Sequence, residues 1–397
     1  MKSLKHFYTL NLTWPVLISG LLLLTVSACE ERFNPEIDPK YENTLVVEGE
    51  ISNAPGPYSV KLSYSGSLES NQVTPVTAAM VEIIDNLDNH EVLTETIPGT
   101  YMTNPEGIRG QEGRLYKIRI SLPDGKTYNS DFQKLRTPPV IKSIDYEIEY
   151  QSDVNLPFDL GGYRFFANTE IPSGDTVYYL WKLTATYKYA VDLIIRWMYD
   201  GQLHPFTNFD SLRYCWTTSR INSYYLFNNE NLNISTLAKF PLHFVGTDVR
   251  DLSIRYSLLT EQLSISKEAY EFWSIVKEQN ENVDDLYSKQ PYQLRGNVYN
   301  ADNINEPVLG YFMVAGKSEN RIFVNRPDYP LIMQYPECKL VEQDYMNFGI
   351  LFYSSPAEWP EFATFDNNGV NAYPPQSCLD CRENGGTIEI PDFWIDN

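Results

Sequence analysis

The sequence predicts a mainly β fold, in which an N-terminal immunoglobulin-like sandwich precedes a second β-rich, sandwich-like domain with an inserted helix. Three observations support this prediction. Apolar and polar residues alternate in several short segments, proline and glycine punctuate the chain between them, and a longer segment from Tyr179 to Tyr187 alternates in the same way. A period of two puts one face of a strand against a core and the other in water.

Residues 44–137 are predicted to form the first domain. The strand candidates are Leu45–Ile51 and the alternating sets Val60, Leu62 and Tyr64, then Val81 and Ile83, then Tyr116, Ile118 and Ile120. Asp124-Gly125 predicts a hairpin turn whose two central residues both take a positive φ. About seven short strands in such a length are typical of an immunoglobulin-like sandwich. Thr137-Pro138-Pro139 ends the domain, because a residue before proline is extended.

Residues 138–397 are predicted to form the second β-rich domain, which ends in a cysteine-containing segment. Ala190–Tyr199 is a further apolar run, and the polar, turn-rich residues 200–235 are expected to form an insertion. Strands are expected to resume around Arg295–Tyr299, Val308–Val314 and Arg321–Val324.

One helix is predicted near residues 266–279. Ser266 is a suitable N-cap, and Glu268 adds an acid to the first turn, where the helix dipole favours one. A single apolar stripe then follows with helical spacing: Ala269, Phe272, Trp273 and Val276. Such a stripe is expected to pack against a sheet.

The first 28 residues are predicted to be a lipoprotein signal peptide. Lys2 and Lys5 precede an apolar stretch that is too short to span a bilayer comfortably. Val26-Ser27-Ala28-Cys29 resembles a lipobox, which implies a diacylglycerol on the Cys29 sulfur and usually an acyl chain on its amino group. Several acyl chains make attachment effectively permanent. The alternative is an ordinary cleaved signal with a coincidental cysteine.

Residues 29–43 are then a lipidated tether. Glu30 and Glu31, directly behind Cys29, resemble a surface-export signal of Bacteroidota lipoproteins, although a solvated tether would also be polar. We therefore expect a lipid-anchored protein of the outer membrane, exposed at the cell surface.

The charge of the chain excludes one class of partner. With 31 basic and 52 acidic residues, the formal net charge is −21. Such a surface repels nucleic acid, so no nucleic-acid role is expected. Apart from the covalent lipid on Cys29, the sequence indicates no cofactor.

Four cysteines remain after Cys29: Cys215, Cys338, Cys378 and Cys381. An even number in an oxidising compartment favours structural disulfides, and the spacing leaves three pairings open. Cys378 and Cys381 form a C-x-x-C motif, so redox activity or zinc binding is the alternative. The prolines before this motif and the glycines after it signal no helix of the thioredoxin type.

No catalytic or metal-binding constellation stands out in the sequence. After the leader only His90, His204 and His243 remain, far apart, and no nucleophile elbow, P-loop or dinucleotide fingerprint is present. The acidic stretches 302–306 and 366–369 are weak calcium candidates, because Asp and Asn also favour turns. Asp175-Thr176-Val177 and Asp210-Ser211-Leu212 resemble a short O-glycosylation sequon, which makes Thr176 and Ser211 candidate acceptors.

The order of several segments resembles a Bacteroidota lipoprotein family, the domain of unknown function 4249. The segments are lipobox Cys29, Asp124–Ser130, Ser266–Trp273, Gln290-Pro291, Arg295–Val298, Leu309–Phe312, Arg321–Val324 and Cys378–Arg382. The resemblance supplies no catalytic residues. Because members are typically encoded beside a TonB-dependent outer-membrane receptor, it implies an accessory lipoprotein that sits on such a barrel.

The leading functional hypothesis is therefore a non-enzymatic accessory to a TonB-dependent transporter, which captures or occludes substrate. The second hypothesis is a β-sandwich adhesin or structural surface protein. The third is a secreted hydrolase whose catalytic residues are dispersed along the sequence.

Overall fold

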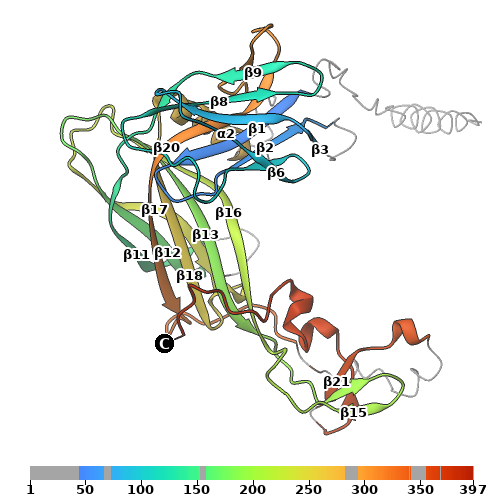
Figure 1. Ribbon diagram of the computed structural model, residues 1–397. Coiled ribbons are helices and arrows are strands. Elements are labelled where there is room, and N and C mark those ends of the chain that lie inside the picture. Colours follow the sequence, from blue (N-terminus) through green and yellow to red (C-terminus); the bar gives the residue numbers. More distant parts are fainter. Residues whose placement is uncertain are drawn as a thin grey trace, which may run out of the picture. The chain divides into compact units, whose positions relative to one another are not determined.

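A computed structural model describes residues 44–66, 73–152, 158–281, 294–338, 340, 355–366 and 368–396. The predicted leader, Cys29 and the tether lie outside the described residues. The mainly β prediction is confirmed (Figure 1). In the described part of the chain, no helix is both long and apolar enough to cross a membrane.

One long sheet, which we call the common sheet, runs through the protein. Among the described residues it has nine strands, in the order β16 (Tyr214–Asn228), β13 (Tyr178–Ala190), β18 (Arg255–Ser264), β20 (Val308–Asn325), β1 (Leu45–Ser52), β2 (Ser59–Tyr64), β7 (Thr100–Met102) and β6 (Thr94–Ile97), with β3 (Thr74–Pro75) beside β2. The first half of β20 pairs in parallel with β1, from Val308 to Ala315. Its second half pairs antiparallel with β18. The sheet is continuous because β20 belongs to both halves.

The first sandwich is completed by a second sheet. Its strands are β19 (Val298–Asn300), β9 (Thr127–Ser130), β8 (Leu115–Ser121), β4 (Met80–Asp85) and β5 (His90–Val92), with β10 (Gln133–Lys134) beside β8. Its core joins Val47 of β1 and Phe312 of β20 to Ile83 and Ile118, all fully buried. Since β19 and β20 follow residue 137, the sandwich takes two strands from the region that the sequence analysis assigned to the second domain.

The second sandwich places a smaller sheet over β13, β18 and the far half of β20. That sheet has the order β11 (Val140–Gln151), β12 (Leu160–Glu170) and β17 (Thr236–Gly246). Trp181 of β13 stacks on Phe240 with ring centroids 4.4 Å apart, and Phe165 of β12 stacks on Tyr256 at 5.7 Å. These rings fill the core of the second sandwich.

The described residues also form a further small sheet and four short 3-10 helices. The sheet order is β15 (Leu203–Pro205), β14 (Trp197–Tyr199), β21 (Phe362–Phe365) and β22 (Asn371–Ala372). The 3-10 helices are η2 (Arg250–Leu252), η4 (Pro356–Glu358), η5 (Gln376–Cys378) and η6 (Cys381–Asn384).

The alternation of side chains gives the common sheet two different faces. In β20, Phe312 and Val324 point into the two sandwich cores, whereas Tyr311 and Met313 belong to a third cluster. That cluster includes Ala269 of the helix α2 (Lys267–Glu281). Both sandwiches therefore use one face of the common sheet, and α2 packs on the other.

The predicted helix is confirmed, including its cap and its packing stripe. The backbone N–H of Ala269 donates to Ser266 Oγ at 3.1 Å. Ala269, Phe272 and Trp273 pack against the sheet, as the apolar stripe predicts.

The expected insertion at 200–235 is wrong for much of its length. Residues 214–228 form β16, which pairs with β13 along nearly its whole length. Its polar composition follows from its position, because β16 is an edge strand whose middle residues meet solvent. The strands expected at 308–314 and 321–324 are likewise parts of one strand of 18 residues.

The hairpin at Asp124-Gly125 is present, but its turn differs from the predicted type. Ser121 pairs with Thr127, and the N–H of Gly125 donates to the carbonyl of Leu122. Only Gly125 has a positive φ, +91°. Pro123 fixes a negative φ at the first central position, which favours a type I turn followed by a left-handed glycine.

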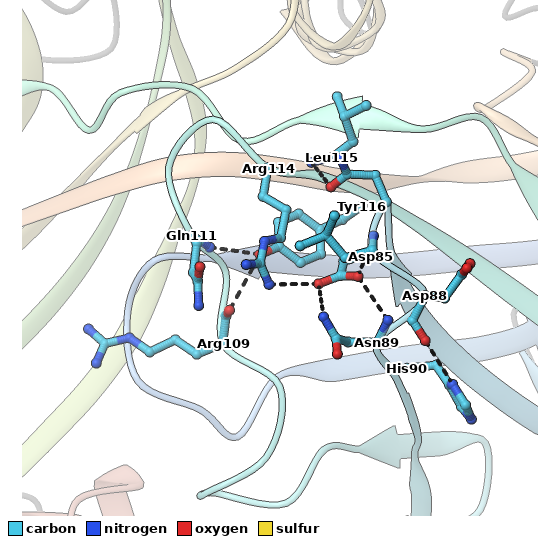
Figure 2. A network of polar contacts seen from close by, with 11 residues as sticks. Asp85, Asp88, Asn89, His90, Arg109, Gln111, Arg114, Leu115 and Tyr116 are labelled. Atoms are coloured by element: carbon cyan, nitrogen blue, oxygen red, sulfur yellow. Dashed lines mark hydrogen bonds and ion pairs between the residues drawn. The ribbon is translucent and has the colours of Figure 1, made fainter.

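Asp85, at the end of β4, is the centre of a network of polar contacts in the first sandwich (Figure 2). It is 1% exposed, and its carboxylate accepts hydrogen bonds from the N–H groups of Leu87 and Asn89 and from the Arg114 guanidinium at 2.8 Å. Burial by itself raises the pKa of Asp85. The hydrogen bonds from Asn89, Leu87 and Arg114 outweigh burial, so the pKa lies below its usual value. Nearby, the Tyr116 hydroxyl donates to the Arg109 carbonyl, in the manner of a tyrosine corner.

Two disulfides tie the C-terminal segment down. Cys215 of β16 bonds to Cys381, and Cys338 bonds to Cys378. Neither bond joins the two cysteines of the C-x-x-C motif. Because Cys215 lies in β16, the first bond fixes the segment directly to the common sheet. Both of its cysteines are fully buried.

We expect Asp85→Asn to lower the free energy of unfolding by about 2 kcal/mol at pH 7, because it removes a buried carboxylate from its guanidinium. A carboxyl group whose pKa is depressed on folding stabilises the fold above its unfolded pKa of about 3.9, and this stabilisation is lost as the pH falls through the lower, folded pKa. The gap between wild type and variant should thus narrow in acid, as measured by urea unfolding. Asp88→Asn, in the same turn and exposed, is the control. A pH-independent gap would contradict the assignment.

We expect the loss of the Cys215–Cys381 bond to cost more stability than the loss of Cys338–Cys378. The bonds span 166 and 40 residues, respectively. A chain-entropy model gives about 5 and about 4 kcal/mol. Paired Cys→Ala variants compared by denaturant unfolding test the order, and the differences should vanish under reducing conditions. The reverse order would contradict this reasoning.

Candidate functional site

The candidate site is a cavity of about 530 Å³ between α2 and the common sheet, on the face opposite the sandwiches. We call it the helix cavity. Strands β1, β2, β13, β16 and β20 supply its floor and one wall, and α2 supplies the other wall. It forms because α2 covers only part of this face.

Aromatic rings line the helix side of the cavity. Trp273 of α2 stacks on Tyr224 of β16 with centroids 5.1 Å apart, and Phe272 meets Tyr311 of β20 at 4.9 Å. Burial raises the pKa of Tyr311 to about 12, so its hydroxyl remains protonated at neutral pH. The rings give the cavity an apolar wall, a surface of the kind that suits flat or ring-shaped groups.

Charged side chains line the strand side. Glu48 and Glu50 project from β1 into the helix cavity, because their neighbours Val47 and Ile51 face the core of the first sandwich. Lys182 forms an ion pair with Glu50. The remaining cations of the described lining are Lys61 and Arg220, which are both exposed.

The charges of Arg220 and Glu48 both affect the pKa of the Tyr224 hydroxyl. Burial raises the pKa of the Tyr224 hydroxyl, the positive charge of Arg220 lowers it, and the negative charge of Glu48 raises it. Both charges are therefore close to this ring. The cavity thus combines an aromatic wall with charges of both signs.

A second cavity, of about 500 Å³, lies where the two sandwiches meet, around Pro138 and Ile171. Its lining includes Thr176, one of the predicted O-glycosylation sites, which is exposed. Ser211 is partly exposed, and its hydroxyl donates to the Asn208 carbonyl. Glycosylation at Thr176 and Ser211 stays a prediction.

The three histidines lie on three different sheets. His90 is in β5, and His204 in β15 contacts Asp200 at an exposed site. His243 is in β17, where burial lowers its pKa to about 4. They do not come together.

In the two acidic stretches, 302–306 and 366–369, carboxylates accept hydrogen bonds from nearby protein groups. The carboxylate of Glu306 accepts hydrogen bonds from Tyr128, Lys126 and Asn300, and Asp366 accepts from the N–H groups of Asn368 and Val370. Among the described residues, no group of three or more His, Cys, Asp or Glu side chains could hold a metal ion.

Sequence reasoning found one wall of the helix cavity but not the other. Phe272, Trp273 and Val276 of the α2 stripe line the cavity, and Phe272 and Trp273 also pack on the sheet. For the strand wall, the available signal was the alternation in the strand 45–51, where Glu48 and Glu50 interrupt the apolar residues and so indicate a polar face. Arg220 was missed, because its strand was expected to be an insertion.

Comparison with known proteins adds a family assignment. No curated protein matches the chain. A family model matches residues 30–321, which is well over half of the sequence. The chain belongs to the family described as a domain of unknown function, DUF4249.

Proposed function

We propose that this protein is a lipid-anchored, surface-exposed accessory of a TonB-dependent outer-membrane transporter, which captures or occludes substrate without chemical catalysis. The helix cavity is the observation that carries the binding role, because it is a partly open site with an aromatic wall and convergent charges. Among the described residues, its lining contains no histidine or cysteine.

Two further observations support the proposed location. The predicted leader ends at Ala28, and Val26-Ser27-Ala28-Cys29 across its end resembles a lipobox. The two disulfides fit an oxidising compartment outside the cytoplasm. The proposal of a transporter as partner rests on the resemblance to a family whose members are typically encoded beside such a receptor.

A second function, an adhesin or structural surface protein, is favoured by one feature of β11. This strand lies at the edge of its sheet, and Tyr146, Ile148 and Tyr150 on its core-facing side are each about half exposed. An exposed edge with apolar side chains is a common docking element. A deletion strain that loses attachment but keeps nutrient uptake would favour this function over the first.

We expect an affinity-tagged chain, purified from detergent-solubilised outer membranes, to bring a TonB-dependent receptor with it. Mass spectrometry of the same preparation should find acyl chains on Cys29. Cys29→Ser should lose both the lipid and the receptor, because an unanchored chain is not held at the membrane. A preparation of lipidated protein with no barrel would contradict the partnership, and an unmodified Cys29 thiol would contradict the anchor.

A further inference from the structure

We propose that the helix cavity binds a small organic anion that carries an apolar ring and several hydrogen-bond acceptors. This inference rests on the proposed function, since it names the substrate class of the same site. Three independent features of the lining support it: the charge balance, an unpartnered donor and the shape of the aromatic wall.

The charges of the lining leave one cation uncompensated. Lys182 is neutralised by Glu50, and Lys61 lies directly opposite Glu48 in the register of β1 and β2. Arg220 has no ion-pair partner among the described residues. In a chain of net charge −21, a site with a surplus positive charge is a local reversal of sign. A guanidinium binds carboxylate, sulfonate or phosphate oxygens through paired hydrogen bonds.

An indole nitrogen supplies the second feature. Nε1 of Trp273 is buried, lies in a residue that lines the helix cavity, and has no hydrogen-bond partner in the part of the chain that the structure describes. A buried donor without an acceptor costs about 1–3 kcal/mol. A ligand oxygen would remove this cost, so the site favours a molecule rich in acceptors.

The aromatic wall supplies the third feature. Tyr224, Phe272 and Trp273 are each partly exposed, so their rings still offer apolar surface. Trp273 stacks on Tyr224 with 29° between the ring planes and contacts Phe272 edge to face, so the three rings form one continuous aromatic wall. A ring resting there would bring its acidic substituent toward Arg220, whose charge acts on Tyr224.

A matched set of probes tests the proposal. Isothermal titration calorimetry would use the full lipidated chain in phosphatidylcholine nanodiscs, with empty nanodiscs as the blank. The probes share one ring system: naphthalene-2-sulfonate is an anion, 2-naphthol is neutral and 2-naphthylmethylammonium is a cation. We expect the sulfonate to bind with one site per chain and at least about tenfold more tightly than either comparator. Its affinity should fall as salt is raised.

Two variants connect the binding to the cavity. Arg220→Gln should weaken sulfonate binding about tenfold, and Trp273→Phe, which keeps a ring but removes the N–H, should weaken it severalfold. Arg119→Gln is the control for loss of an arginine elsewhere, because Arg119 lies on β8 outside the lining, where it is partly exposed and pairs with Glu82. Thermal melting checks that each variant is folded. Equal affinity for sulfonate and naphthol, no sulfonate binding, or no effect of Arg220→Gln would overturn the proposal.

The outcome is separable from that of the transporter experiment. If the sulfonate fails to bind while the receptor still co-purifies, the ligand class is wrong and the partnership stands. If the sulfonate binds as expected but no receptor co-purifies, the cavity assignment stands and the partnership falls. Tighter binding of the ammonium probe would assign the site to cations.

Discussion

The pairing of one strand, β20, with two partners is the constraint on which the rest of the structure depends. Its first half pairs with β1 and its second half with β18, so the two sandwiches share one sheet. Glycines permit this path. A Cβ on Gly310, which has φ +81°, would lie 2.2 Å from the Val47 carbonyl oxygen, and one on Gly316 would lie 2.2 Å from that of Arg136. Any larger residue would push the neighbouring backbone away.

The helix cavity follows from the same strand. Because β20 alternates along its length, the residues that fill the two cores leave Tyr311 and Met313 on the opposite face, where α2 packs. The acids of β1 and the cations of β2, β13 and β16 then meet over the floor of the cavity. The proposed binding role would thus use the face of the common sheet that the two sandwich cores leave free.

Local features of this fold were predictable, and long-range ones were not. The helix was found because its cap at Ser266 and its apolar stripe lie within a few turns of each other, and the hairpin because Asp124-Gly125 is a local signal. The parallel pairing of β1 with β20 joins residues about 260 positions apart, and no local pattern encodes it. The disulfide partners are equally non-local. Arg220 escaped notice because a polar edge strand looks like a loop when its neighbour is unknown.

Amide hydrogen exchange along β20 tests the central claim most directly. If one common sheet unites the two sandwiches, amides in the halves beside β1 and β18 should open with similar free energies, close to that of global unfolding. If the amides beside β1 exchanged at least about tenfold faster or slower than those beside β18, the sandwiches would unfold independently. The account of a single continuous sheet would then be contradicted.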